Sequence, residues 1–330
     1  MATNYIFIGD RIEFEDSNTF DLGFNHTLRR PTDVEVVEIR KQIKSYFEIT
    51  NSGYFNRYEQ YEKKISDTNS TFHRIEKSED FKYSVIEQPM NWMLYYESID
   101  IVFNISKFDF TQIFNFRYAT QKNEETGKQE LSQYGGSGKM LSRSMYNYFD
   151  EFSANFKIKK INKSISEDIV KLHEQVKLFL DKKDEYQHVY KALQDFKAHK
   201  EISNKSPFKL IVLIACLEGL LTDGSLNRTT SINRQLQTKL NLINNRCLNP
   251  IDFRKYITGP DTLRLEKVIE SIYAYRSKIA HGDVLEFKKS LAILENIEFE
   301  TILEFVLDLS KLVFEFSIKE PKLIVDLKQI

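Results

Sequence analysis

The chain has 330 residues, of which 41% are hydrophobic and 13% aromatic, so it can bury a substantial core and is long enough for two domains. Its 47 basic and 48 acidic residues give a net charge of -1, so overall charge gives no argument for nucleic-acid binding and only local patches remain. Two cysteines, Cys216 and Cys247, exclude a disulfide framework and a zinc-type cluster. A cytoplasmic location fits this cysteine usage best.

No targeting or membrane segment is expected. A signal peptide requires a basic segment followed by a long apolar stretch, and the start of the chain has no such pattern. The longest apolar run, from Phe208 to Leu221, is shorter than the roughly 20 residues of a membrane span and contains Glu218. This run therefore predicts a buried core helix, and we expect no membrane partner.

Residues 1–160 mix helical and strand patterns. Capping-box spacing at Thr32–Glu35 and helical spacing up to Phe47 predict a helix over 32–48, and Tyr54 to Ile65 indicates a second. Alternation with period two predicts strands at Ile12 and Phe14, at Tyr83 and Val85, and between Ile99 and Ile105. We therefore predict an α+β N-terminal domain, with a sensor or regulatory role and a protein or small-molecule trigger as hypotheses. Its aromatic residues around Tyr58 are core by default, although they could stack on bases.

Residues 119–143 are polar and glycine-rich, which predicts a loop. Its centre, Gly135 to Lys139, resembles a phosphate-binding loop only superficially. Such a loop needs glycine five positions before its Gly-Lys pair and Ser or Thr after it, where Gln133 and Met140 stand here. We interpret this stretch as a flexible turn and expect no cofactor.

From residue 161 onward the hydrophobic periodicity is helical. Ser164–Glu167 has capping-box spacing and opens one or two helices up to about residue 200. Further helices are predicted after Ser206-Pro207, around 232–243, over 263–281 and across 287–316. The second domain, 161–330, is thus predicted to be an all-helical bundle around the apolar helix at 208–221, and the chain to be mainly α overall.

One segment places a permanent cation and an imidazole together at the end of a predicted helix: Arg276 and His281. Cleaving RNA without a metal requires a base for the 2′-hydroxyl proton and positive charge where the phosphorane gathers negative charge. The imidazole suits the first task because its ordinary pKa lies near 6.5, and the guanidinium suits the second because it grips phosphate oxygens with a fork of donors. The other histidines form no such constellation, and His188 and His199 are expected on a solvated helix face.

The spacing of this pair poses a geometric difficulty. Five residues of regular helix rotate by about 140° beyond a full turn, so the two side chains would not share one face. We expect His281 to occupy the helix cap just before Gly282, where the backbone can leave helical angles. The alternative is that Arg276 and His281 only satisfy exposed carbonyls and complement the helix dipole.

The segment from Tyr273 to Gly282 resembles the R-x4-6-H motif of the HEPN superfamily (higher eukaryotes and prokaryotes nucleotide-binding), specifically its ApeA-like branch. The upstream segment Ala215–Leu221 looks like the earlier core helix of that branch, which carries a Leu-Glu-x-Leu-Leu pattern. Together the two matches cover about residues 205–320. R-x4-H alone is a weak pattern, and its flanking residues make the combined match more specific: Tyr273, Ser277, Ile279 and Gly282.

The resemblance implies a helical bundle that forms a homodimer, with the motif helices lining a shared cleft. It also implies metal-independent endoribonuclease activity that leaves cyclic phosphate ends, in proteins that often act as toxins or antiviral defence effectors. On this resemblance His281 is the general base and Arg276 the phosphate clamp, with RNA as substrate and no metal. The alternative is a non-catalytic HEPN module that binds nucleotides or partner proteins.

Three residues are candidates for supporting this pair. Glu218 stands in an otherwise apolar helix, so it must find a partner, for which Arg276 is the natural candidate, or reach solvent at the bundle end. Ser277 could hydrogen-bond to phosphate or to His281, or be an ordinary exposed serine. Tyr273 belongs to the motif helix and completes the candidate site.

Residues 224–260 form a local basic patch that leads into the motif helix. Six basic residues face a single acidic one, Asp252, which makes a phosphate-tracking surface plausible and its affinity for RNA steeply dependent on salt. A solvated face without a partner is the commoner explanation of such a run. The candidate RNA-binding residues are Arg228, Arg234, Lys239, Arg246, Arg254 and Lys255.

Overall fold

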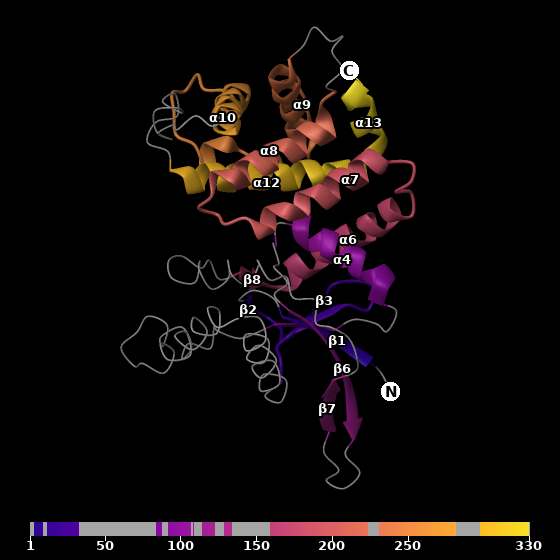
Figure 1. The fold of residues 1–330 in the computed structure, drawn as a ribbon. Helices are drawn as coiled ribbons and strands as arrows, with labels where there is room; N and C mark the ends of the chain where they lie inside the picture. Colours follow the sequence, from indigo (N-terminus) through magenta and orange to yellow (C-terminus); the bar gives the residue numbers. More distant parts are fainter. Residues whose placement is uncertain are drawn as a thin grey trace, which may run out of the picture. The chain divides into compact units, whose positions relative to one another are not determined.

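The chain divides into two compact units, one formed by residues 1–97, 110–145 and 152–171 and the other by residues 98–109, 146–151 and 172–330. A computed structural model describes residues 3–8, 12–32, 84–87, 92–106, 108, 114–122, 129–133, 159–223, 231–281 and 298–329. This described part is mainly helical, with strands confined to the first unit (Figure 1).

The first unit contains an antiparallel sheet of six strands in the order β3-β4-β5-β1-β6-β7. Two further short strands, β2 and β8, pair in parallel. The predicted strands at Ile12–Phe14 and around Val85 are confirmed as β2 and β5. The strand bounds are β1 Thr3–Ile8, β2 Ile12–Phe14, β3 Thr19–Asp21, β4 Thr27–Arg29, β5 Val85–Glu87, β6 Phe114–Lys122, β7 Gln129–Gln133 and β8 Lys159–Ile161.

The loop predicted over residues 119–143 is wrong in part. Strands β6 and β7 pair here as an antiparallel hairpin, with Tyr118 opposite Gln133 and Lys122 opposite Gln129. A ladder of main-chain hydrogen bonds does not need apolar side chains, so the polar composition concealed the strands. The glycine-rich centre at 135–139 lies outside the described residues, as do the helices predicted at 32–48 and 54–65 with their aromatic residues.

The strand predicted between Ile99 and Ile105 is also wrong, because this segment belongs to helix α4, Trp92–Ile105. Residues 98–106 are buried except for Asp100, which is partly exposed. A segment that is apolar all round has no polar face to reveal a helical period, so periodicity could not separate a buried helix from a strand. Helix α4 contributes residues to both units.

The helices predicted after residue 161 are confirmed wherever the chain is described, whereas the part of the predicted 287–316 segment that precedes residue 298 lies outside the described residues. Helix α6 contributes residues to both units, so the predicted domain boundary at 160/161 differs from the observed division after residue 171. The helix bounds are α6 Lys163–Leu180, α7 Gln187–Phe196, α8 Pro207–Leu221, α9 Ile232–Arg246, α10 Leu265–Ala280, α12 Phe299–Lys319 and α13 Pro321–Gln329. Two short 3-10 helices are η2 Lys197–Glu201 and η3 Phe253–Lys255.

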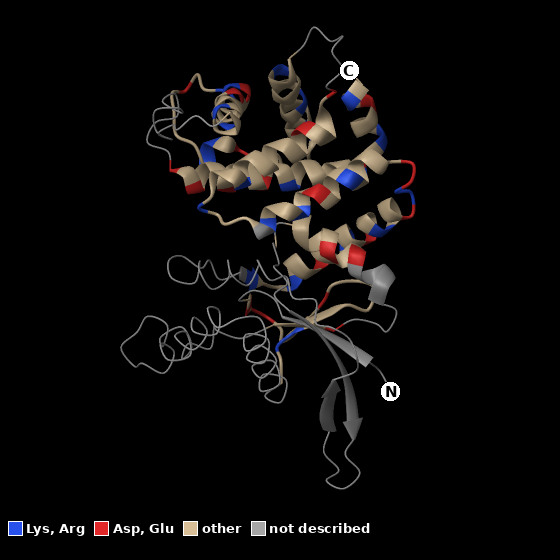
Figure 2. Cartoon of the chain, viewed as in Figure 1, with Lys and Arg blue, Asp and Glu red and all other residues tan. Residues whose placement is uncertain are grey.

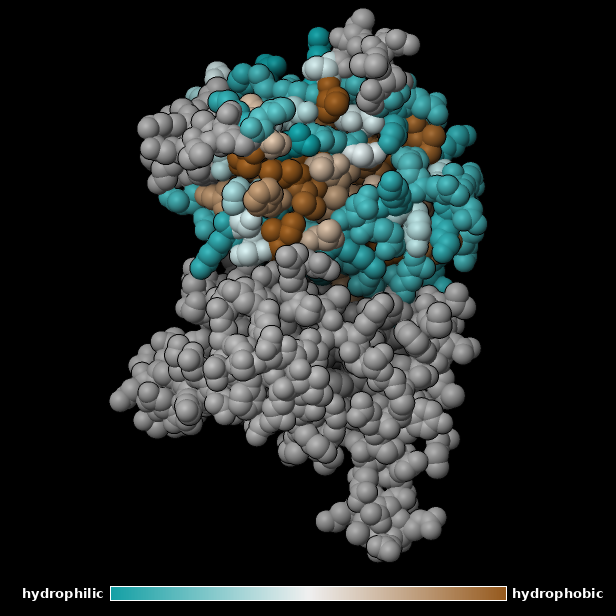
Figure 3. Space-filling view, viewed as in Figure 1, coloured by the Kyte–Doolittle hydropathy of each residue, from teal (hydrophilic) through white to brown (hydrophobic). Residues whose placement is uncertain are grey.

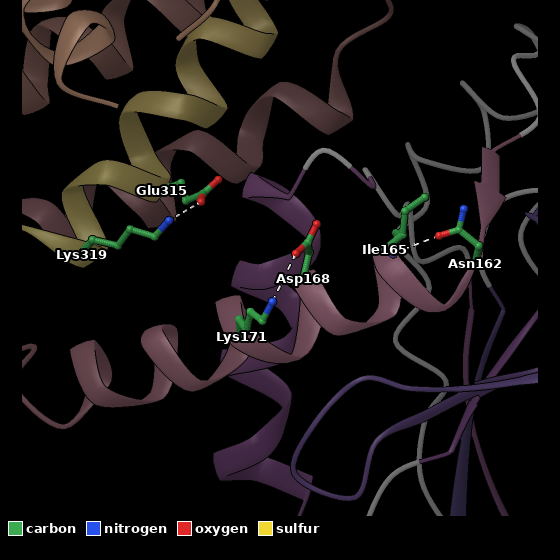
Figure 4. Close-up of polar contacts among 6 residues, drawn as sticks. All are labelled: Asn162, Ile165, Asp168, Lys171, Glu315 and Lys319. Carbon is green, nitrogen blue, oxygen red and sulfur yellow. Dashed lines mark hydrogen bonds and ion pairs between the residues drawn. The ribbon is translucent and has the colours of Figure 1, made fainter. Parts of the chain in front are cut away.

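The N-cap of helix α6 lies two residues earlier than the predicted cap, Ser164. The Asn162 side chain, not that of Ser164, caps the helix by accepting a hydrogen bond from the backbone N–H of Ile165 at 3.0 Å (Figure 4). Asparagine is as good an N-cap as serine, and the spacing alone could not choose between them. Figure 4 also shows two ion pairs within single helices, Asp168–Lys171 and Glu315–Lys319, of the exposed kind that contributes little to stability.

Helix α8 is the core helix of the second unit. It contacts α7, α9, α10, α12 and α13. Ser206 caps it by accepting a hydrogen bond from the backbone N–H of Phe208 at 3.3 Å, and Pro207 occupies its first position, as predicted. The helix is not enclosed on every side, however. Phe208 is 64% exposed, and Ala215 and Gly219 are exposed further along the helix.

Residues 98–109 belong to the helical unit through specific contacts. The Ser98 hydroxyl lies 2.7 Å from Nε2 of His173, and the Lys200 ammonium donates to the carbonyl of Phe103 at 3.2 Å. Because these contacts join segments about 70 to 100 residues apart in sequence, no local pattern could reveal that the second half of α4 completes the helical unit. None of the described helices is long and apolar enough to cross a membrane.

Candidate active site at the end of helix α10

Helix α10 carries the Arg-His segment and is anchored by one apolar face. The buried side chains at Leu265, Val268, Ile272 and Tyr275 recur at helical spacing, and the helix contacts α8 and α9. Arg276 follows the last of these buried residues, so its side chain leaves the helix at the edge of the core, where it is partly exposed. The packing of α10 therefore determines where this guanidinium can reach.

Arg276 forms an ion pair with Glu218 of α8. The distance between its Nη2 and Oε2 of the carboxylate is 2.9 Å, and the two side chains are 21% and 17% exposed. The expected pairing of the only acidic residue in the α8 core helix with the motif arginine is thus confirmed. Because both groups are largely removed from water, each depends on the other for its stabilisation.

Tyr273 lies one turn before Arg276 on the same helix. The guanidinium carbon is 5.8 Å from the centroid of the tyrosine ring, which is within the range of a cation–π contact. The Arg276 side chain is therefore restrained by a carboxylate on one helix and an aromatic ring on its own. Such double restraint reduces the conformational freedom that a binding arginine must lose when it meets a ligand.

The ion pair uses only part of the hydrogen-bonding capacity of its two groups. Nε of Arg276 and Oε1 of Glu218 are both buried and have no hydrogen-bond partner. A bidentate pair would have engaged both donors and both acceptors. The arrangement thus leaves a guanidinium donor and a carboxylate acceptor unsatisfied in a partly buried position, which is costly unless a ligand or water completes it.

Burial governs the titration of this cluster. It raises the pKa of Glu218 above its ordinary value, while the charge of Arg276 and a hydrogen bond from Tyr273 oppose that rise. Burial and the nearby carboxylate also raise the pKa of Tyr273, so its hydroxyl stays protonated at neutral pH and can donate a hydrogen bond.

His281 occupies the C-cap of α10, as expected, with φ -88° and ψ 3°. Its backbone N–H donates to the carbonyls of Ser277 and Lys278 at 3.1 and 3.2 Å, and its side chain is exposed. No hydrogen bond joins it to Arg276, although the structure describes both side chains. Ser277, one residue after the arginine, is partly exposed, and Gly282 lies outside the described residues. The joint action of the His281 imidazole and the Arg276 guanidinium on one phosphodiester therefore stays a prediction.

Glu218 is held in place by the dense capping of the last turn of α8. Thr222 donates its hydroxyl to the carbonyl of Glu218 at 2.8 Å. Two lysines satisfy other carbonyls of the turn: Lys328 of α13 donates to Gly219 at 2.5 Å and Lys239 of α9 to Leu221 at 2.9 Å. Cations at this end also complement the helix dipole. Sequence reasoning missed Lys328, which lies far along the chain and belongs to no motif.

Lys239 must be removed from the candidate RNA-binding residues. It is only 6% exposed, and its ammonium donates to the carbonyl of Leu221 and to the side chain of Gln235. An ammonium committed to the protein interior cannot reach a phosphate in solvent. The charge count of the patch could not separate a structural lysine from a surface one.

The other patch residues fall into three groups. Arg234, Arg246 and Lys255 are exposed. Arg254 is exposed as well, but its Nη2 donates to the carbonyls of residues 260, 261 and 263, so it also holds the loop that leads into α10. Arg228 lies outside the described residues.

The expectation that His188 and His199 lie on a solvated face is wrong. His199 is 1% exposed, and its Nδ1 lies 2.5 Å from the carbonyl of Phe196. His188 of α7 is half-buried, and burial together with the nearby Lys328 lowers its pKa. The hydrophobic pattern around these polar residues gave no signal of their burial.

Within the described ranges, no group of three His, Cys, Asp or Glu residues could hold a metal ion. Comparison with known proteins adds no assignment, because no family model, no curated protein and no solved structure matches the chain.

Proposed function

We propose that this protein is a metal-independent endoribonuclease of the HEPN type, which cleaves RNA through attack of the 2′-hydroxyl on the adjacent phosphate. The observation that carries the proposal is the half-satisfied guanidinium of Arg276, restrained by Glu218 and Tyr273 and left with a buried Nε–H donor. The resemblance of the helical domain to the HEPN superfamily supports it. The proposed site of action is cytoplasmic RNA, in the role of a toxin or an antiviral defence effector.

In this proposal Arg276 binds the scissile phosphate. Its remaining donors stabilise the negative charge that gathers on the phosphorane, and they do so without reorganisation because the side chain is already restrained. Glu218 and Tyr273 are positioning residues. The carboxylate also balances the arginine charge in the absence of RNA, so the free protein does not contain a buried, unpaired cation.

His281 accepts the proton of the 2′-hydroxyl as general base. The 2′-oxygen then forms the cyclic phosphate as the bond from phosphorus to the 5′-oxygen of the next nucleotide breaks, and that 5′-oxygen leaves with a proton from water or from the imidazolium. The backbone torsions of His281 lie in the bridge region, which is sparsely populated and often occupied by residues of active sites. Its exposed side chain is free to rotate toward a phosphodiester that Arg276 holds. Ser277, one turn before His281, can hydrogen-bond either the phosphate or the imidazole.

We further propose that the active form is a homodimer. The resemblance implies a cleft shared by two motif helices, and an exposed apolar stripe on α8 supports a self-association face next to Glu218. Phe208 and Ala215 are exposed along this stripe, and Figure 3 shows apolar surface gathered where α8 and α12 lie. Exposed apolar patches of this kind mark interaction surfaces.

A non-catalytic module that binds nucleotides or a partner protein is the second candidate. It is favoured by one observation, namely that the exposed His281 makes no hydrogen bond with Arg276. In such a module Arg276, paired with Glu218, would bind a phosphate group, and no general base would act on that phosphate.

Expression of the wild-type chain, His281→Ala and Arg276→Ala, followed by inspection of cellular RNA and growth, separates the two candidates. We expect RNA loss with the wild type and intact RNA with both variants. Purified wild-type protein should also cut RNA in the presence of a chelator. Equal RNA integrity with all three proteins under every inducing condition rules out the enzyme.

A further inference from the structure

The outer face of α9 carries no acidic residue. Over the 15 residues from Ile232 to Arg246 the chain has arginines near both ends and amides between them. In Figure 2 this helix shows basic segments and no acidic one. Solvated surface helices usually carry charges of both signs, often paired four residues apart. The exposed or partly exposed polar residues of this face are Asn233, Arg234, Gln237, Thr238, Asn241, Asn245 and Arg246.

Several amides of α9 have structural roles, but others do not. Asn244 is buried and fixes the following loop by exchanging two hydrogen bonds with the backbone of Ile251, at 2.7 and 3.0 Å. On the outer face, Gln237 donates to Asn233 at 3.0 Å and Asn245 to Asn241 at 3.3 Å. Asn241 also donates to the carboxylate of Glu266 of α10 at 2.7 Å, so this amide links α9 to α10. The Gln237–Asn233 pair makes no further side-chain hydrogen bond within the described part of the chain, so its remaining donors and acceptors can meet solvent or a ligand.

This face begins beside the candidate active site. Gln235 accepts a hydrogen bond from the backbone N–H of Asp223 at 3.2 Å, and Lys239 caps the carbonyl of Leu221. The first two turns of α9 therefore pack on the same end of α8 that presents Glu218 to Arg276. Arg234 is an exposed basic side chain within these two turns of α9.

We propose that the outer face of α9 binds single-stranded RNA and leads it to Arg276. Arg234 and Arg246, about 18 Å apart along the helix axis, contact phosphates, and the amides between them hydrogen-bond to base edges. A single strand fits because its unstacked bases expose the edges that amides recognise, whereas the edges in an RNA duplex are difficult to reach. This inference rests on the ribonuclease function proposed above.

Binding of a fluorescein-labelled RNA oligomer of mixed sequence tests the inference by anisotropy over a series of salt concentrations. The full chain carries Arg276→Ala, so that RNA is not consumed. Adding Arg234→Glu and Arg246→Glu should weaken binding at least tenfold at low salt. It should also make the dependence of log affinity on log salt shallower by roughly 1.4, since each phosphate contact on a single strand accounts for about 0.7.

The matched control makes the same charge change elsewhere, at two exposed lysines of the second unit, Lys182→Glu and Lys205→Glu. Equal weakening by the control pair, binding of duplex RNA as tight as of single strands, or no RNA binding at all would overturn the inference. The outcome is independent of cleavage. If the wild-type chain cuts no RNA while the α9 pair alone weakens binding, the proposed nuclease fails and the RNA surface stands.

Discussion

Arg276 donates to one carboxylate oxygen of Glu218, and the Nε–H of the arginine has no partner. A ligand or water that accepts from this Nε–H would therefore complete the hydrogen bonding of the guanidinium. The sequence predicted the pairing because an isolated acid in an apolar helix must find a cation. It could not predict that the pair would be monodentate, because that depends on the relative placement of α8 and α10 to within about an ångström.

Removing Arg276 should make the stability of the protein fall more steeply with rising pH than that of the wild type. Burial already raises the pKa of Glu218 from 4.5, and the arginine charge opposes that rise. In Arg276→Ala the pKa climbs further, so the native state binds more protons than the unfolded state and loses stability as pH rises from about 4.5 through the raised pKa. Urea unfolding between pH 5 and pH 7.5 measures the loss.

The double variant Arg276→Ala with Glu218→Gln is the control, since glutamine does not titrate. Its stability should change less with pH than that of Arg276→Ala alone. The same pH dependence in both variants would show that Glu218 is not the group responsible.

Lys239→Met should destabilise the protein by about 1–2 kcal/mol, because the hydrogen bond from a charged donor to the carbonyl of Leu221 is lost while the aliphatic stem is kept. Affinity for RNA should stay unchanged, since this ammonium is buried. Urea unfolding and oligonucleotide binding on the same preparation measure both. A variant of normal stability that binds RNA more weakly contradicts the structural role of this lysine.

The helices after residue 161 could be predicted because most have a clear helical period, and the apolar α8 has a recognisable start. Ser206-Pro207 opens α8, and His281 ends α10 as a cap. Elements without a polar face, such as α4, or with too few apolar residues, such as β6 and β7, could not be recognised from periodicity. What failed was the assignment of segments whose environment is created by distant parts of the chain.

The exposed stripe of α8 leads to a prediction about assembly. Phe208→Ser should shift the chain from dimer toward monomer by at least tenfold in dissociation constant, because an apolar anchor is lost from the proposed face. Stability of the monomer should change by no more than about 0.5 kcal/mol, as for most exposed positions. Sedimentation equilibrium measures the association.

Leu178→Ser is a matched control on α6, since Leu178 is 67% exposed, similar to Phe208 at 64%. Its variant should associate as the wild type does. If both substitutions leave the mass unchanged, or if Leu178→Ser disrupts assembly equally, the α8 face is not the site of self-association.

For the whole molecule, the change to a helical period near residue 161 predicted a domain boundary that differs from the observed division into two units. The helical unit includes residues 98–109, which lie far upstream. Ser98 with His173 and Phe103 with Lys200 show why, since both contacts bring an early segment into the later unit. A linear scan of the sequence cannot detect such an exchange.

A fragment comprising residues 161–330 should therefore be less stable than the same helices in the full chain. Without the buried side chains of Val102 and Phe103, apolar surface of the helical unit is left open to water. Thermal unfolding should begin at a lower temperature, and the fragment should bind a hydrophobic dye. Unfolding of the fragment at the temperature of the full chain would show that residues 98–109 are dispensable.

In the proposed reaction, Arg276 and His281 direct a 2′-hydroxyl onto the adjacent phosphate. A short RNA that the wild-type protein cuts at a mapped position, remade with a single 2′-deoxy nucleotide on the 5′ side of that position, tests it most directly. We expect the wild type to leave cyclic phosphate ends on the unmodified RNA in the presence of a chelator and not to cut the modified position. Cleavage at the deoxy position, or loss of all cleavage with the chelator, would contradict it.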